Sequence, residues 1–186
     1  MANRRMKVSF TLDEKDIAYF QGRFKKAKRA ARSQDEDEVK AQARALVESI
    51  RAERGVPHFV LESVSALEDL VALVDDDAYK APKLVVNKVI AALAYFADPD
   101  DLIPDEIPVL GFLDDAIMIK VVETEFKHEL AGYRKFRKFL RGAEQRPWTQ
   151  VARVRLPGRI DAESAKLREE FERKQKADEK KGLGIL

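Results

Sequence analysis

Seven carboxylates lie between residues 98 and 115, and they are the side chains in this sequence best placed to do chemistry. Clustered carboxylate oxygens are the ligands that Mg²⁺ and Ca²⁺ prefer. If the chain folds back here, Asp101 and Asp105 could meet Asp114 or Asp115 and hold such an ion. A metal in that position could activate water, which would make the protein a metal-dependent hydrolase.

The same carboxylates also have a structural interpretation. Aspartate commonly caps helix ends by accepting hydrogen bonds from backbone amides. The spacing of these residues also lacks the glycine and the terminal glutamate of an EF-hand loop. We therefore expect caps, with Mg²⁺ or Ca²⁺ binding as the alternative.

Other reactive arrangements are sparse. Glu125 and His128 have the Glu-x-x-His spacing of di-iron bundles, but those bundles need a second such pair, so we expect both residues at the surface. The absence of cysteine excludes disulfides, thiolate metal sites and a cysteine nucleophile. No catalytic triad or glycine-rich phosphate loop is present in the sequence. We expect a protein that is not an enzyme and needs no cofactor.

Composition narrows the class of protein further. The 186 residues are 45% hydrophobic and 37% charged, with 35 Lys and Arg against 33 Asp and Glu, which is typical of a folded globular chain. The longest apolar stretch, residues 84–97, contains Asn87 and Lys88 and is shorter than the ~20 residues that a membrane-spanning helix needs. The first residues lack the apolar run of a secretory signal. We expect a cytoplasmic protein, with peripheral membrane contact still open.

Apolar residues recur at three- and four-residue spacing, which predicts helices. The expected helices cover residues 12–32, 34–54, 58–74, 82–97, 109–141 and 161–181, and possible capping boxes begin at Thr11 and Ser33. Residues 143–160 carry prolines and a glycine and are expected to be irregular, and the last helix has only a thin apolar face. The fold class is therefore all-α, a compact bundle of five or six helices.

The helices suggest three parts of the chain. Residues 1–55 are expected to form a hairpin of one basic and one acidic helix, and residues 56–142 a helical core. Residues 143–186 combine the irregular segment with a charged C-terminal helix.

Positive charge is concentrated at the start of the chain. Residues 1–32 hold ten Lys and Arg and three Asp and Glu, whereas residues 33–80 hold five and twelve. A basic amphipathic helix suits anionic lipid or nucleic-acid phosphate, but the opposite charges favour packing of the two segments on each other. Few aromatic residues accompany the cations and no nucleic-acid motif is present, so nucleic acid is the lesser alternative. The candidate anion-binding residues are Arg23, Lys25, Lys26, Lys28, Arg29 and Arg32.

A stiff corner is expected between the helices at 82–97 and 109–141. Three prolines within ten residues fix the backbone φ angle and remove amide donors. The apolar residues between them are expected to be tucked under the helices, and a following glycine allows close backbone approach. The residues of this structural motif are Pro99, Leu102, Ile103, Pro104, Ile107, Pro108 and Gly111.

The segments 101–105, 107–111 and 113–115, with Glu129–Phe136 downstream, resemble the YkvA-like family of bacterial domains of unknown function. The resemblance covers about residues 65–140. It implies a helical fold unit, no settled activity and, in some relatives, a helix pair at or in membranes. Asp98 and Asp100 make this turn more acidic than the family pattern, which weakens the membrane interpretation and favours ion binding.

The expected function is therefore a non-enzymatic helical module. It would bind a protein partner, a second copy of itself or a membrane surface. Metal binding at the acidic corner and nucleic-acid binding through residues 1–32 are the alternatives.

The corner yields a stability prediction. Replacing Gly111 with leucine should overpack it and lower the free energy of unfolding by about 1–3 kcal/mol. Thermal melting of the variant checks this, and an unchanged midpoint would show that Gly111 lies at no close contact.

Overall fold

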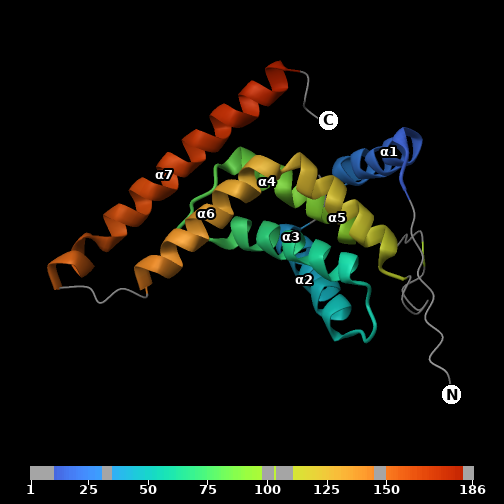
Figure 1. Cartoon of the computed structure of the whole chain (residues 1–186), viewed down its shortest axis with the longest axis horizontal. Coiled ribbons are helices and arrows are strands. Elements are labelled where there is room, and N and C mark those ends of the chain that lie inside the picture. Colours follow the sequence, from blue (N-terminus) through green and yellow to red (C-terminus); the bar gives the residue numbers. More distant parts are fainter. Residues whose placement is uncertain (1–10, 31–34, 98–102, 104–110, 145–149, 182–186) are drawn as a thin grey trace.

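The computed structural model describes residues 11–30, 35–97, 103, 111–144 and 150–181, which form a helical bundle (Figure 1). The all-α fold class is confirmed for these residues, which contain no strand. The α-helices are α1 (Glu14–Ala30), α2 (Glu36–Ala52), α3 (His58–Asp75), α4 (Lys83–Leu93), α5 (Leu113–Glu125), α6 (Lys127–Glu144) and α7 (Gln150–Lys180). A 3-10 turn, η2 (Ala94–Ala97), follows α4.

The described part of the chain has seven α-helices rather than five or six, because the helix expected over residues 109–141 is divided at Phe126. The backbone of this residue has φ −98° and ψ 21°, outside the helical range. Its amide still donates to the Val122 carbonyl at 3.0 Å. An apolar stripe with four-residue spacing runs through this break, since Val122, Phe126 and Leu130 are all buried.

The C-terminal region also differs from expectation. Helix α7 begins at Gln150 and runs through Pro157, whereas residues 143–160 were predicted to be irregular. A proline removes one amide donor from a helix, and Pro157 and Gly158 lie on an exposed flank of α7. Leu167 and Phe171 are buried, so the thin apolar face is docked along α6.

The two N-terminal helices begin at aspartate caps. Asp13 accepts from the amides of Lys15 and Asp16, and Asp16 accepts in return from the Asp13 amide at 3.0 Å. This reciprocal box lies two residues beyond the one predicted at Thr11. Asp35 caps α2 by accepting from two amides of its first turn, while Ser33 lies outside the described residues.

Helices α1 and α2 both pack on the central helices. The first contacts α4, η2 and α5, and the second contacts α3, α4 and η2. The basic helix α1 was expected to pack on the acidic segment that follows it, but it packs on α4, η2 and α5 instead. Its Lys28 pairs with Glu125 of α5 at 2.8 Å. The three-part division of the chain stays a prediction.

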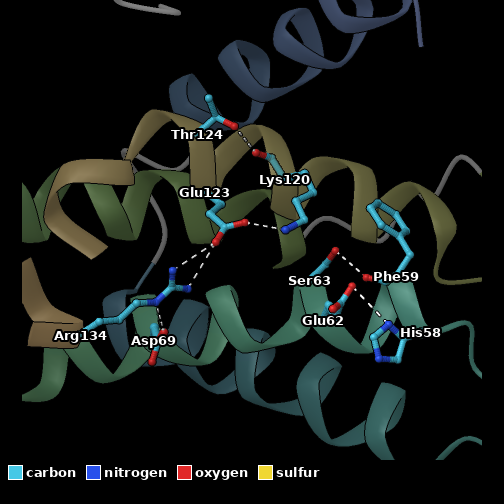
Figure 2. A network of polar contacts seen from close by, with 9 residues as sticks. All are labelled: His58, Phe59, Glu62, Ser63, Asp69, Lys120, Glu123, Thr124 and Arg134. Atoms are coloured by element: carbon cyan, nitrogen blue, oxygen red, sulfur yellow. Dashed lines mark hydrogen bonds and ion pairs between the residues drawn. The ribbon is translucent and has the colours of Figure 1, made fainter. Parts of the chain in front are cut away.

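Helix α3 is the centre of the core, and Val60, Val64, Leu67 and Val71, which recur at three- and four-residue spacing, are buried while Val74 is half-buried. Arg134 ties α6 to this helix and to α5, as Figure 2 shows. Its Nε donates to Asp69 Oδ2 at 2.6 Å, and its terminal nitrogens lie 3.3 Å from Glu123 Oε1. Glu123 also binds Lys120 Nζ at 2.8 Å. The Glu123 carboxylate thus joins α5 to α6 through Arg134.

Close approach of α6 and α7 depends on Gly132. A Cβ atom added there would lie 2.9 Å from Phe171 Cδ2 and 3.0 Å from the Tyr79 hydroxyl oxygen. Both of these neighbours are buried and held by other contacts. The glycine is therefore required by packing.

We predict that Gly132→Ala lowers the free energy of unfolding by about 1–3 kcal/mol, because overpacking outweighs the better helix propensity of alanine. Gly22→Ala in α1 is the matched control. Its added Cβ meets nothing within 4 Å, so this change should raise stability by about 0.5–1 kcal/mol. Urea unfolding of both variants measures the difference, and stabilisation by both would rule out the tight α6–α7 contact.

Candidate functional site

The outer face of α4 separates two hollows on the protein surface. Val89, Ile90 and Leu93 bury the inner face in the core. On the outer face Leu84 is 68% exposed and Lys88 is also exposed. These two residues line both hollows, one on the side of α1 and the other on the side of α7. Part of α4 is therefore exposed, although it lies within the longest apolar stretch of the sequence.

The hollow beside α1, which we call the basic groove, is open and has a volume of about 610 Å³. Four cationic residues and one acidic residue line it, so its charge is strongly positive. Its lining residues are Lys25, Lys28, Arg29, Leu84, Asn87, Lys88, Ala91 and Glu125.

Packing of α1 explains how the cations reach the groove. Phe20, Phe24 and Ala27 are buried against the bundle, which turns the adjoining side of the helix toward α4. Lys28 lies 4.9 Å above the Phe24 ring and also pairs with Glu125. Among the described residues Lys25, Arg29 and Lys88 form no ion pair, although Lys88 also lowers the pKa of Glu129 on the other side of α4.

The hollow beside α7, which we call the α7 pocket, is more enclosed and has a volume of about 260 Å³. Leu73, Tyr79, Val85 and Phe171 give it apolar walls. Its ionisable lining residues come from α4, α6 and α7, and they are Lys88, Glu129, Arg168, Glu172, Lys176 and Glu179.

The connection between α3 and α4 forms one wall of this pocket and is held by α7. Asp76 Oδ1 accepts from the Ala78 and Tyr79 amides, and Asp76 Oδ2 accepts from the Tyr133 hydroxyl at 3.1 Å. The Tyr79 carbonyl accepts hydrogen bonds from Ser164 and Arg168 of α7. Burial raises the pKa of Tyr79 to about 12, so its hydroxyl remains protonated.

Backbone strain is localised in this wall. Lys80 has a φ of 53°, in the left-handed region that non-glycine residues rarely adopt. Its carbonyl accepts from Arg168, and its Nζ pairs with Asp161 at 2.7 Å. Such conformations persist only where the surroundings fix them, and α7 supplies both contacts.

Glu129 is the carboxylate that lies deepest among those lining the α7 pocket. Burial raises its pKa, and the neighbouring Glu125 adds to this, while His128 and Lys88 act in the opposite direction. Its Oε2 atom is closed to solvent and has no hydrogen-bond partner among the described residues. Perturbed carboxylates of this kind are concentrated at functional sites.

The acidic corner is only partly described. Asp114 and Asp115 are buried in the first turn of α5, where carboxylates favour the helix dipole. Asp114 Oδ2 accepts from the Ile103 amide at 3.2 Å, so this side chain ties the corner to α5 in a capping-type role. Asp101 and Asp105 lie outside the described residues. Elsewhere in the described chain no three acidic or histidine residues gather as a metal site would need, and Mg²⁺ or Ca²⁺ binding stays a prediction.

The predicted corner-motif and basic residues also fall partly inside and partly outside the described part of the chain. In the corner motif Ile103 is half-buried and Gly111 is buried. The motif residues Pro99, Leu102, Pro104, Ile107 and Pro108 lie outside the described residues, as does Arg32. Of the other basic residues, Lys25, Lys28 and Arg29 line the groove, whereas Arg23 and Lys26 do not.

Glu125 and His128 were expected at the surface, and that expectation is wrong. Each side chain is only 18% exposed. Glu125 pairs with Lys28 of α1, and His128 Nε2 lies 2.9 Å from Asp178 Oδ2 of α7. They secure one helix on each side of α4. Sequence reasoning also missed Lys88 and Glu129 as site residues, although a lysine inside the apolar run 84–97 was a usable signal.

Comparison with known proteins connects this region to a family. The model described as "Protein of unknown function (DUF1232)" matches residues 88–121, from the middle of α4 to α5. The "Uncharacterized membrane protein YkvA" of Bacillus subtilis (strain 168) is 47% identical over 47 residues, which are 25% of this chain and 44% of that protein. The chain thus matches less than half the length of this relative. No solved structure matches the chain.

These matches confirm the YkvA-like resemblance for residues 88–121. None of the described helices combines the length and the apolar character needed to cross a bilayer.

The electrostatics of Glu129 yield a prediction about pH. A carboxyl whose pKa is raised by folding stabilises the native state when protonated, and this contribution is lost as pH rises through the folded pKa. At neutral pH the buried charge is therefore unfavourable, and Glu129→Gln should raise the melting midpoint. The gain should disappear below the ordinary glutamate pKa of 4.5.

Thermal melts of both proteins between acid and neutral pH measure this gain. The exposed Glu179, replaced by glutamine, is the control for the change in net charge. An equal gain in both variants, or a gain independent of pH, would contradict the assignment to burial.

Proposed function

We propose that this protein is a helical module that binds the anionic surface of a lipid bilayer through the basic groove. The observation that carries the proposal is the convergence of Lys25, Arg29 and Lys88 around the exposed Leu84. These cations come from two helices separated by more than fifty residues of sequence, and none has an ion-pair partner in the described part of the chain.

The charge and the apolar residue have complementary roles at a membrane surface. A lysine or arginine near an anionic bilayer contributes about 1 kcal/mol to binding. A leucine that enters the interface adds up to about 1.5–3 kcal/mol when fully buried. Lys28 is neutralised by Glu125, so three cations and Leu84 are the expected contact residues.

The relative supports a membrane in preference to a protein partner. YkvA of Bacillus subtilis is called a membrane protein, and the matched family segment contains Lys88. Contact with the bilayer surface requires no spanning helix. This proposal makes the basic groove a docking face, and it leaves the acidic corner as a structural element.

Vesicle flotation tests the proposal. The wild-type chain should float with vesicles of phosphatidylcholine and phosphatidylglycerol, remain unbound with phosphatidylcholine alone, and dissociate at high salt. Replacing Lys25, Arg29 and Lys88 together with glutamine should lower the partition coefficient about a hundredfold, from about 1 kcal/mol per cation. Leu84→Ser should lower it about tenfold.

A matched triple variant controls for net charge. Lys138, Arg155 and Arg173 are exposed cations away from the groove, and glutamine at these positions removes the same charge. Equal losses in both triple variants would show a nonspecific charge effect and contradict the groove. Binding of DNA or RNA without vesicle binding would replace the proposal with the nucleic-acid alternative.

A further inference from the structure

We propose that the α7 pocket takes one alkyl chain of an anionic lipid whose head group lies in the basic groove. The ligand is thus an amphipathic anion, with its charge in one hollow and its chain in the other. The position of the head group rests on the proposed function, and the chain site goes beyond it. Leu84 and Lys88 connect the two hollows, because both residues line each of them.

The ridge between the hollows has the character of the junction in such a ligand. Leu84 and Lys88 are four positions apart, so they lie on the same face of α4. Leu84 is 68% exposed and Lys88 is also exposed. A ligand that spans both hollows therefore passes an ammonium group and an apolar side chain, which match the start of a lipid chain next to its anionic head.

The α7 pocket is apolar at its deep end. Of its lining residues, Leu73, Tyr79 and Phe171 are at most 6% exposed, whereas Glu172 and Glu179 are exposed. Apolar side chains from α3, the α3–α4 connection and α7 thus form the interior, and charged side chains lie at the rim. An alkyl chain that enters the pocket would leave water by contact with these buried residues, which is favourable by the hydrophobic effect.

The ionisable residues of the α7 pocket select no charge in its ligand. Its six ionisable lining residues are three basic and three acidic. Lys176 pairs with Glu172 at 2.7 Å, and Lys88 lowers the pKa of Glu129. The basic groove differs, because four cations and one carboxylate line it. The charged part of an amphipathic anion therefore suits the groove, and its uncharged part suits the pocket.

The volumes of the hollows agree with this division. The pocket has a volume of about 260 Å³, below the roughly 300–1,000 Å³ of cavities that take drug-sized molecules. It therefore suits one alkyl chain, and the second chain of a diacyl lipid would stay outside. The basic groove is larger, at about 610 Å³, and is open enough for a polar head group.

Calorimetric titration of the full chain tests the proposal with octyl phosphate, octyl glucoside, inorganic phosphate and octylamine, all below micelle-forming concentrations. The first probe has an anion and a chain, the next two have only one of these, and octylamine has the opposite charge. We expect octyl phosphate to bind at least tenfold more tightly than each of the others. From butyl to octyl phosphate, affinity should rise by up to about fourfold for each added methylene.

Variants of the groove test the position of the head group. Lys25 and Arg29 line the groove and not the pocket, so replacing both with glutamine should weaken octyl phosphate at least tenfold and leave octyl glucoside unchanged. Lys138 and Arg173 are exposed and line neither hollow, and their replacement with glutamine is the matched control. Equal losses of octyl phosphate affinity in both double variants would overturn this position.

A variant of the pocket tests the position of the chain. Val85→Phe fills space in the pocket and should weaken octyl phosphate and octyl glucoside while leaving inorganic phosphate unchanged. Val86→Phe is the matched control, because Val86 is also half-buried but lines neither hollow. Thermal melts of both variants show whether they fold, and the chain-length series tests the wild type if they do not.

Two results would overturn the chain site, which are equal losses in the two phenylalanine variants and an octyl phosphate affinity no higher than that of inorganic phosphate. Vesicle flotation that still depends on the groove would then leave the proposed function intact. Vesicles also identify the source of the lipid. Weaker flotation of Val85→Phe than of Val86→Phe supports a lipid of the docked bilayer, and equal flotation with weaker octyl phosphate binding supports a free single-chain lipid.

Discussion

Helix α4 buries one face and leaves the other uncovered, and the surface features of this protein depend on that constraint. Val89, Ile90 and Leu93 fix the helix in the core. Helices α1 and α7 then cover only the margins of its outer side, where the pairs formed by Lys28 and His128 add polar contacts to their apolar packing. Leu84 and Lys88 remain between two hollows of different character.

The position of α7 follows from a small apolar contact supported by polar ones. Leu167 and Phe171 are too few to hold a long helix, and the approach of Phe171 to Gly132 leaves no space for a side chain there. Ser164 and Arg168 add hydrogen bonds to backbone carbonyls of the α3–α4 connection. The strained backbone at Lys80 persists because this helix holds it, so pocket wall and helix depend on each other.

Unfavourable electrostatic interactions are concentrated in the two hollows beside α4. Lys25, Arg29 and Lys88 repel one another in the groove, and burial raises the pKa of Glu129 despite the attraction of His128 and Lys88. Stability alone would favour neutral or paired residues at these positions. An external anion at the groove would relieve the repulsion among its cations.

The sequence by itself determined the all-α class, the apolar spacing on α3 and through Phe126, and the resemblance of the segment around α4 to a family of unknown function. These properties are encoded locally, in periodicity and in a motif of unusual composition. Only the tertiary structure decided that α1 packs on α4 and α5, that the expected long helix is interrupted at Phe126, and that Lys88 lines one groove with Lys25 and Arg29. Charge pattern alone favoured packing of α1 on the acidic segment that follows it, because opposite charges near in sequence are the simplest pairing to assume. The fold instead satisfied the apolar face of α1, and burial of Phe20 and Phe24 outweighed exposed charge pairs that contribute little in water.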